Sequence, residues 1–373
     1  MILNIDLIPM VTICQISTIK DLQKLINLSS IINCSQRLPA VFAVWHICYS
    51  THQRPMSVRA KFDVNRFLDK LFTGITDGKL AEHLPADEVL RLLNEVRRCF
   101  FLQPMLLKIG TPVNICGDLH GQFNDLMRIM DSEGFPHCRS YLFLGDYVDR
   151  GAQSVELILF MLACKVRYPK NFYMLRGNHE TSSINKSYGF YKNVLDLYRS
   201  DQLYDAFNKV FDCMPLAALI SGRILCMHGG LSPPMLEAKN LKVIDAIERP
   251  LPDSLINPAN NQMAVDLLWA DPDVNVPLFA ANRRGVGHIF GQEVIDRIRT
   301  RFGVDLIIRA HQVVLDGHEF FNGTPDSGLI TLFTAPHYCG MYDNSGAIVR
   351  VAVDLGVSFK RFEPTFKNSP SRG

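Results

Sequence analysis

The sequence of 373 residues lacks several patterns that would place it in common classes of protein. None of its ten cysteines forms a C-x-x-C pair, so neither a disulfide framework nor a zinc knuckle is indicated, and we expect reduced thiols packed in a core. No block of like charge occurs and the net charge is only +2, which argues against nucleic-acid binding driven by phosphate neutralisation. The longest apolar stretch near the start, residues 38–50, is too short to span a bilayer. The chain also opens without a secretion signal, so we expect a cytoplasmic or nuclear location.

Composition and pattern along the chain predict one large globular domain with an N-terminal appendage. Hydrophobic residues make up 47% of the sequence and charged residues only 20%, which is enough apolar surface for a sizeable core. Residues 1–55 are rich in isoleucine and leucine, without turn signals or a sustained helical stripe, and we interpret them as an appendage. Amphipathic patterns begin after Met56, so the predicted domain spans 56–365 and leaves a short tail at 366–373.

Apolar runs of strand length alternate with helical stripes from residue 111 onward. Helical spacing marks four segments, which are 62–72, 86–103, 124–134 and 154–168. Five apolar runs that break into glycine and polar residues lie in 111–118, 140–146, 171–180, 223–230 and 304–311. This is an α/β pattern, in which loops at strand ends carry function, so we expect the five polar ends to meet at one edge of a sheet. Further runs at 328–339 and 346–362 predict strands that build a second sheet.

The five strand ends carry side chains that bind metals or act in acid–base chemistry. In chain order these are Asp118 and His120 in GDLHGQ, Asp146, Asp149 and Arg150 in GDYVDRG, Arg176, Asn178, His179 and Glu180 in RGNHE, His228 in HGG, and His311 in RAH. A single residue of this kind at a strand end is more often a cap or a satisfied core residue. This chain has five such loops, and all of them carry residue types that bind metals. Caps and core packing therefore do not explain the whole set.

The residue types in these loops favour a pair of divalent cations. Imidazole, carboxylate and amide oxygen without thiolate suit Mn²⁺, our first expectation, or Fe²⁺ or Zn²⁺. Two such ions bridged by one carboxylate lie ~3.5–4 Å apart, lower the pKa of a shared water to roughly neutral, and hold phosphoryl oxygens in line for attack. Arg150 would supply fixed positive charge beside them for a phosphoryl transition state.

The series GDLHGQ, GDYVDRG and RGNHE, followed by HGGLSP, RGV, RAH and APHYCG, resembles the motifs of the metal-dependent phosphoprotein phosphatases. The resemblance covers residues 60–365, and SINKSYGFY, LLWADPD, FGQE and RAHQVV are most similar to type 1 catalytic subunits. It implies an α/β (α+β) fold, the calcineurin-like metallophosphoesterase fold, with a central β-sandwich flanked by helices. It also implies a protein serine/threonine phosphatase in which hydroxide held by a dinuclear metal site attacks phosphoserine or phosphothreonine directly.

The resemblance implies a role for each matching residue. The implied metal ligands are Asp118 and His120 for the first ion, Asp146 bridging both ions, and Asn178, His228 and His311 for the second. His179 is implied as the general acid that protonates the leaving oxygen, oriented by the carboxylate of Asp149. The implied phosphate-binding residues are Arg150, Arg284 and Asn178, with Tyr338 lining the site.

The sequence departs from the type 1 pattern around the implied site. His337 stands where the family typically has asparagine, Met341 where an acidic residue is expected, and Arg283 where aspartate is usual. Residues 278–282 lack an expected tryptophan and glutamate. These changes remove negative charge from the rim of the site, so we expect this enzyme to disfavour basic substrates relative to type 1 enzymes.

Phosphoprotein substrates and regulatory subunits are the implied partners. Type 1 enzymes bind a short extended hydrophobic motif of their regulatory subunits in a surface pocket, and the matching positions here are all apolar: Ile224, Leu306, Phe320, Leu355, Val357 and Phe359. Ordinary strand packing explains the same pattern equally well. The acidic residues expected beside this pocket are replaced by SGR at 221–223, which would alter the charge preference of a partner.

Two other functions stay open at the level of sequence. One is a metallophosphoesterase acting on small molecules such as dinucleoside polyphosphates or nucleotides, although the RAHQVV and APHYCG segments favour the protein phosphatase branch. The other is an inactive scaffold that keeps the fold and binds regulatory subunits. The complete set of implied ligands, together with His179, argues against the scaffold.

Overall fold

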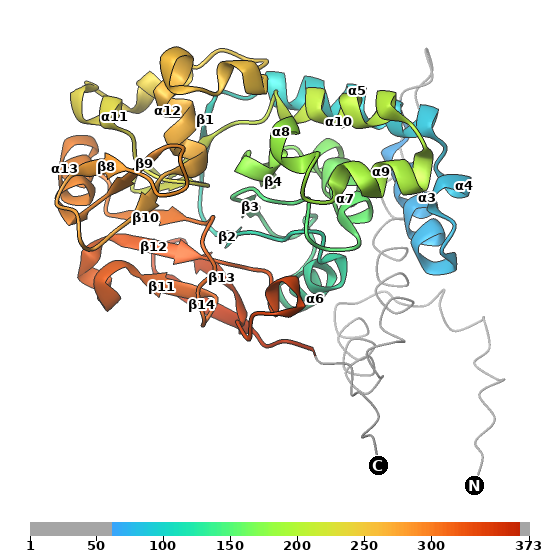
Figure 1. The fold of residues 1–373 in the computed structure, drawn as a ribbon. Helices are drawn as coiled ribbons and strands as arrows, with labels where there is room; N and C mark the ends of the chain where they lie inside the picture. The colour runs from blue at the N-terminus through green and yellow to red at the C-terminus, as the bar shows by residue number, and fades with distance from the viewer. Residues whose placement is uncertain (1–61, 366–373) are drawn as a thin grey trace, which may run out of the picture. The chain divides into compact units, whose positions relative to one another are not determined.

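The computed structural model describes residues 62–365, in which strands and helices alternate around three sheets (Figure 1). The predicted appendage at 1–55 and the predicted tail at 366–373 lie outside these residues. Their boundaries therefore remain predictions.

Two larger sheets and one small sheet make up the β-structure. The six-stranded sheet runs in the order β1 (Leu106–Ile109), β5 (Ala217–Ile220), β6 (Ile224–Met227), β10 (Leu306–Arg309), β12 (Leu329–Leu332) and β11 (His318–Phe320). The five-stranded sheet runs in the order β14 (Val357–Phe362), β13 (Gly346–Val351), β2 (Val113–Cys116), β3 (Tyr141–Phe143) and β4 (Phe172–Met174). The small sheet contains β7 (Asp271–Pro272), β9 (His288–Phe290) and β8 (Phe279–Ala281).

Apolar side chains from both larger sheets pack into one cluster, which makes the pair a β-sandwich. Ile115 of β2 and Leu142 of β3 belong to this cluster together with Cys226, Ile308 and Ile330 of the other sheet. Because successive side chains of a strand point to opposite faces, the neighbours of these residues point away from the cluster. The central β-sandwich implied by the resemblance is therefore present.

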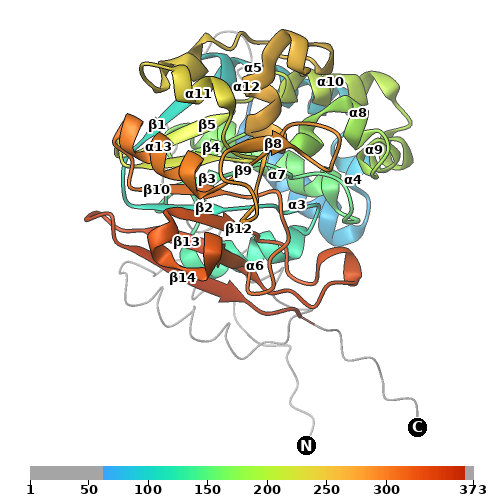
Figure 2. The ribbon, with the colours of Figure 1, turned by 60° about the vertical axis from the view of Figure 1, so that its left-hand side comes forward.

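Helices cover the outer faces of the two sheets. Their bounds are α3 Val64–Asp77, α4 Leu80–His83, α5 Ala86–Phe101, α6 Phe123–Glu133, α7 Ser154–Arg167, α8 Ser182–Asn185, α9 Phe190–Tyr198, α10 Asp201–Phe211, α11 Pro233–Glu237, α12 Pro258–Trp269 and α13 Gln292–Phe302. On the outer face of the six-stranded sheet, Leu225 and Ile307 pack with apolar residues of α11, α12 and α13. On the side of the five-stranded sheet, α7 contacts β4 and packs against α3, α5 and α6. In Figures 1 and 2, α11, α12 and α13 lie together, apart from α3, α6 and α7.

The predicted placement of the C-terminal strands in one second sheet is wrong for the run at 328–339, whereas the run at 346–362 does form β13 and β14 of the five-stranded sheet. The runs at 328–339 and 346–362 do not build a sheet of their own: β12 joins β10 by parallel pairing, whereas β13 pairs antiparallel with β2. The five functional strands are likewise divided, with β2, β3 and β4 parallel in one sheet and β6 and β10 parallel in the other. The polar loops therefore meet at one edge of the sandwich rather than at one edge of a single sheet.

The cysteines of the described part are all free, as predicted, but the prediction that they pack in a core is wrong for Cys138, which is exposed, and for Cys99 and Cys339, which are only partly buried. The free cysteines are Cys99, Cys116, Cys138, Cys164, Cys213, Cys226 and Cys339. None of the helices within residues 62–365 combines the length and the apolar character needed to cross a membrane.

Candidate metal centre

The five polar loops converge where the ends of parallel strands from both sheets meet. The loops after β2, β3 and β4 come from one sheet, and the loops after β6 and β10 come from the other. A single bridge between Asp118 and Phe333 joins the two sheets at this edge, and the backbone N–H of Gly117 donates to Thr334 Oγ1 at 2.7 Å. This contact brings together residues more than two hundred positions apart.

Several site residues hold left-handed backbone conformations that non-glycine residues rarely adopt. The φ angles are 41° at His120, 54° at Asp146, 72° at Asp149, 68° at Arg150 and 67° at His311. Such conformations cost free energy and persist where surrounding structure imposes them, which is typical of functional sites. Here they turn the side chains out of the strand direction and toward one another.

Close approach of two loops requires glycine at two positions. A Cβ atom on Gly145 would lie 2.4 Å from the backbone nitrogen of Gly177, and a Cβ atom on Gly177 would lie 2.2 Å from Asp146 Oδ1. The loops after β3 and β4 therefore pack backbone to backbone, with the Asp146 carboxylate against the second glycine.

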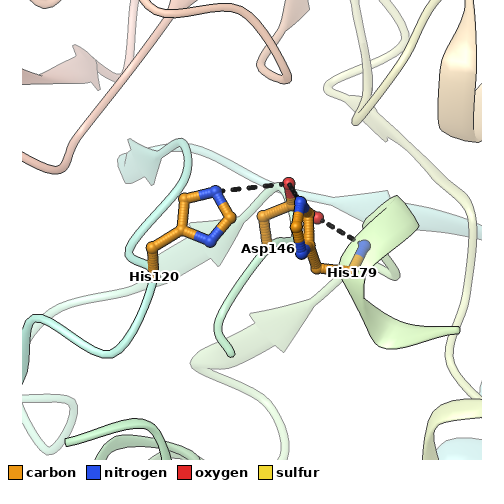
Figure 3. Close-up of side chains that lie close together, drawn as sticks. All are labelled: His120, Asp146 and His179. Carbon is orange, nitrogen blue, oxygen red and sulfur yellow. Dashed lines mark hydrogen bonds and ion pairs between the residues drawn. The ribbon is translucent and has the colours of Figure 1, made fainter. Parts of the chain in front are cut away.

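The first ligand group consists of His120, Asp146 and His179, whose ligand atoms all lie within 4.8 Å of one another. Asp146 Oδ2 is 3.5 Å from His120 Nε2 and 3.9 Å from His179 Nε2 (Figure 3). Asp118 lies beside this group, with its Oδ2 3.7 Å from His120 Nε2. Four side chains thus surround the position at which the sequence predicts the first ion, and His179 is one of them although its implied role is that of an acid.

The second ligand group consists of Asp146, His228 and His311, with the amide oxygen of Asn178 among them. His228 Nε2 is 2.8 Å from Asn178 Oδ1, 3.2 Å from His311 Nδ1 and 3.4 Å from Asp146 Oδ1. His311 Nδ1 is 2.9 Å from the same amide oxygen. The lone pairs of two imidazoles, an amide and a carboxylate thus point at one small volume.

A cation fits this second group better than protons do. A proton on His228 Nε2 can be donated to only one of its three neighbours at a time. The amide oxygen of Asn178 and the carboxylate of Asp146 are acceptors and supply no further proton. The remaining ring nitrogens, His228 Nδ1 and His311 Nε2, are buried without a hydrogen-bond partner. Neutral imidazole and carboxylate oxygen are the donors that Mn²⁺, Fe²⁺ and Zn²⁺ accept. The residues present therefore fit a divalent ion.

Burial leaves two of the candidate histidine ligands, His120 and His311, short of protons, whereas at His228 the charge of Asp146 outweighs burial and raises the pKa above its usual value. Burial lowers the pKa of His120 to about 3, and it also lowers the pKa of His311 well below its usual value, with the charge of His228 as the next cause. Burial, and then the charge of Asp146, raise the pKa of Asp118 to about 7. Neutral histidines have free lone pairs, and a carboxyl with a raised pKa gains from a nearby positive charge.

Asp146 differs from its neighbours in keeping its negative charge. Burial opposes the charged form, but His228 and His179 outweigh it and hold the pKa of Asp146 well below its usual range. One of its oxygens faces the first group and the other faces the second. This is the arrangement that the predicted bridging carboxylate requires.

His179 and Asp149 form the buried pair that the resemblance implied. His179 Nδ1 lies 2.6 Å from Asp149 Oδ2, while Asp149 Oδ1 accepts from the backbone N–H of Phe190 at 2.8 Å. Burial lowers the pKa of His179, but Asp146 and the hydrogen bond with Asp149 outweigh it and raise this pKa above its usual value. A histidine with a raised pKa holds a proton that it can give to a leaving group.

The candidate phosphate-binding residues are held by aromatic contacts and by a hydrogen bond. The guanidinium of Arg150 stacks 4.2 Å from the ring centroid of Tyr188, and the ring of Tyr338 lies 5.0 Å from that of His120. Arg284 Nε donates to Asp271 Oδ2 at 2.7 Å. Tyr188 and Arg284 both line a cavity of about 500 Å³ that also contains Trp269.

Glu180, one of the strand-end candidates of the sequence, has a supporting role that the sequence analysis did not give it. Its carboxylate accepts from the backbone N–H groups of Asp146, Tyr147 and Gly177 at 2.8, 2.8 and 2.9 Å. It thereby fixes the loop that carries Asp146. The signal was present in the sequence, because a glutamate in a loop that follows directly on a buried strand has to find partners when it is itself buried.

A second supporting network, also without a role in the sequence analysis, connects Arg309 to Arg284. Arg309 is fully buried and donates to Gly229 O at 2.7 Å and to Asp271 Oδ1 at 3.0 Å. The other oxygen of Asp271 accepts from Arg284. Asp271 therefore orients the predicted phosphate-binding arginine, a contact between distant loops that sequence spacing does not reveal.

Comparison with known proteins identifies the family of this chain. A family model described as calcineurin-like phosphoesterase matches residues 111–315. The chain is 43% identical over 311 residues to serine/threonine-protein phosphatase PP1-delta of Caenorhabditis elegans, covering 83% of this chain and 98% of that protein. It is also similar in structure to a protein serine/threonine phosphatase from Saccharomyces cerevisiae with similarity to human phosphatase PP5. That match has a TM-score of 0.72 and 31% identity, and covers 80% of this chain and 96% of the other.

Proposed function

This chain belongs to the calcineurin-like phosphoesterase family, with serine/threonine protein phosphatases as relatives, and we propose that it hydrolyses phosphoserine and phosphothreonine in other proteins. The family and fold class predicted from the sequence are confirmed. That relationship makes the chain a phosphoric monoester hydrolase. The observation that carries the mechanism is the position of Asp146 between two groups of metal-ligand side chains.

The proposed cofactors are two divalent ions. We expect Mn²⁺, with Fe²⁺ and Zn²⁺ as the alternatives. Bound ions would supply a water of lowered pKa and positive charge for the phosphoryl oxygens. The donor atoms support ions of this borderline class, because no thiolate lies in either group within residues 62–365. Asp118, His120 and Asp146 would hold one ion, and Asp146 with the group around His228 the other.

The remaining site residues have proposed roles toward the substrate. His179 holds a proton at Nε2 for the leaving serine or threonine oxygen, and Asp149 fixes the ring through Nδ1. Arg150 and Arg284 would bind phosphoryl oxygens, since each is held by a neighbour, Tyr188 and Asp271 respectively, and needs little reorganisation. Asn178 and Tyr338 would complete the phosphate site.

Hydrolysis of a phosphoserine peptide by the purified full chain with Mn²⁺ tests this function. We expect turnover by the wild type and a loss of at least about a thousandfold in Asp118→Asn, because the substitution removes a ligand charge from the centre. Turnover of a dinucleoside polyphosphate under the same conditions is expected to be much slower. Absence of phosphopeptide turnover by the wild type would favour an inactive scaffold instead.

The proposed preference against basic substrates follows from two departures from the type 1 pattern around the site. Arg283 and Met341 are both exposed, and neither supplies the negative charge expected there from the type 1 pattern. We expect the ratio of kcat/KM between a basic and an acidic phosphopeptide to be lower than for a type 1 enzyme. A ratio equal to that of a type 1 enzyme would contradict the preference.

The proposed regulatory pocket is supported by one continuous apolar group. Leu306, Phe320, Leu355, Val357 and Phe359 are only partly buried and pack against the cluster between the sheets, to which buried Ile224 belongs. Their partial exposure leaves apolar surface for an extended peptide. Arg223 lies beside Ile224 and pairs with Asp305, so a partner would meet little net negative charge at this point. Anisotropy titration with a labelled peptide carrying two apolar anchors tests the pocket.

A cytoplasmic or nuclear location is also a proposal. Its support is the reduced state of the cysteines in the described part, since free thiols are typical of reducing compartments. Fluorescence imaging of the tagged full chain tests it, and secretion into the medium would contradict it.

A further inference from the structure

Three large apolar side chains stand exposed on two adjacent turns beside the metal centre. Leu315 is 70% exposed, Met341 77% and Tyr342 49%. The turns are joined by a hydrogen bond from the backbone N–H of Ser345 to Leu315 O, at 2.9 Å. We call these three residues the apolar rim. Isolated exposed apolar residues are ordinary, but neighbouring ones at the edge of a site are typical of binding surfaces.

The apolar rim is continuous with the catalytic site through Tyr338. The ring of Tyr342 lies 5.7 Å from that of Tyr338, which in turn lies 5.0 Å from the ring of the metal-ligand candidate His120. On the other turn, Val314 packs in a small apolar cluster with Phe333 and Tyr338. Ring contacts therefore connect Tyr342 of the apolar rim to Tyr338 and His120, and Leu315 directly follows a residue of the cluster that contains Tyr338.

The turn that carries Met341 and Tyr342 is held in one conformation. The backbone N–H groups of both residues donate to Tyr338 O at 3.1 Å. Asn344 is buried, accepts from the backbone of Tyr338 at 3.0 Å and donates to Ala335 O at 2.9 Å. A ligand that binds a preformed surface loses little free energy in ordering it.

Two carboxylates follow members of the apolar rim in the sequence. Asp316 follows Leu315 but pairs with Arg361 at 3.1 Å, and Asp343 follows Tyr342. These carboxylates neighbour the apolar rim in the sequence, while its three members carry no charge. Met341 in particular occupies a position where the type 1 pattern has an acidic residue.

We propose that the apolar rim binds an apolar side chain of the phosphoprotein substrate, close in sequence to the phosphorylated residue. This inference rests on the proposed function. It concerns an apolar side chain of the substrate, whereas the proposed charge preference concerns only the charge of the substrate. An extended peptide advances about 3.3 Å per residue, so the bound side chain would lie roughly two to four residues from the phosphoserine. Desolvation of one leucine-sized side chain on this surface corresponds to about a tenfold gain in kcat/KM.

A set of phosphoserine peptides that differ only in having leucine or serine at one flanking position tests the proposal. The peptides place leucine two, three or four residues before or after the phosphoserine, and none of the changes alters charge. The enzymes compared are the full-length wild type, the double variant Leu315→Asn/Met341→Gln, and the control Leu102→Asn, all with Mn²⁺. Leu102 is a matched control because it is 87% exposed but follows α5, outside the rim.

The wild type and Leu102→Asn should prefer leucine about tenfold in at least one position, and the double variant less than twofold. Hydrolysis of p-nitrophenyl phosphate, which has no flanking residues, should be equal in all three enzymes. No leucine preference in the wild type, or an equal preference in the double variant, would overturn the proposal. If the wild type hydrolyses neither substrate, the proposed function fails, and anisotropy with the same labelled phosphopeptides still decides whether the rim binds leucine.

Discussion

The Nδ1 atom of His179 lies 2.6 Å from Oδ2 of Asp149, and both side chains are buried at the edge of the metal centre. Asp149 is held in turn by the backbone N–H of Phe190. The contact fixes one ring nitrogen and leaves Nε2 3.9 Å from Asp146 Oδ2. A ring oriented in this way suits an acid that acts on a leaving group.

Asp149→Asn should lower kcat for a phosphoserine peptide by about 10²–10³-fold, because the variant loses the carboxylate that orients and charges His179. The loss should be less than tenfold for p-nitrophenyl phosphate, whose leaving group needs no proton. Steady-state kinetics with both substrates measures the difference. Asp196→Asn, at an exposed carboxylate on α9, is the control and should match the wild type. Equal losses on the two substrates would show that the pair acts in positioning metal or phosphate rather than as an acid.

Gly177→Ala should abolish most activity, because its Cβ atom would lie 2.2 Å from Asp146 Oδ1 and 2.3 Å from the backbone nitrogen of Asp146. Either the carboxylate or the two loops must move, and metal affinity should fall with activity. Metal content and phosphopeptide turnover of the purified variant measure the effect. Gly110→Ala is the matched control, since a Cβ atom there has no neighbour within 4 Å. Wild-type activity in Gly177→Ala would contradict the packing of these loops.

Much of this candidate centre could be predicted from the sequence because its candidate ligands closely follow apolar strands. Asp118 follows β2, Asp146 follows β3 and His228 follows β6, and in each case the change from apolar to polar residues marks the strand end. Parallel pairing then brings such ends together. Local pattern was sufficient to find these residues.

Contacts between distant segments could not be predicted in this way. Strand β12 pairs with β10 and strand β13 with β2, although both strands have similar apolar patterns. Their partners depend on packing across the whole sandwich, which a local pattern does not contain. Glu180 and Asp271 went without a role for the same reason, because their function lies in hydrogen bonds to other loops.

Glu133→Gln should destabilise the fold at neutral pH by about 1 kcal/mol, because it removes an ion pair with Arg350. The effect is no larger because Arg350 is partly exposed and solvent screens the pair. Arg350 donates to both carboxylate oxygens, at 2.7 and 2.6 Å. Burial opposes the charged form of Glu133, but Arg350 outweighs it and lowers the pKa of Glu133 below 4.5. A lowered pKa in the folded state means that the stabilisation is present above about pH 4.5 and is lost as the pH falls through the folded-state pKa.

Urea unfolding of the wild type and Glu133→Gln at pH 7, 5 and 4, and at the lowest pH where both remain folded, measures this dependence. The difference in unfolding free energy should be constant from pH 7 to 5 and shrink below that. Glu293→Gln is the control, because Glu293 forms an exposed pair with Arg297 within α13. A difference that grows toward low pH would contradict the sign of the pKa shift.

Asp146→Asn should remove both metal ions, whereas a substitution in one ligand group should remove one. Asp146 has Oδ2 3.5 Å from His120 Nε2 and Oδ1 3.4 Å from His228 Nε2, so its charge serves both groups. His228→Asn removes a candidate ligand of the second group only, and it leaves His120, Asp118 and Asp146 around the first. After equilibration with Mn²⁺ and removal of free ion, mass spectrometry of the metal should give about two ions per wild-type chain, about one for His228→Asn and close to none for Asp146→Asn. His137→Asn, outside the centre, should retain the wild-type content. Equal metal content in Asp146→Asn and His228→Asn would mean that the carboxylate belongs to one ion only, and the case for a bridged pair would be lost.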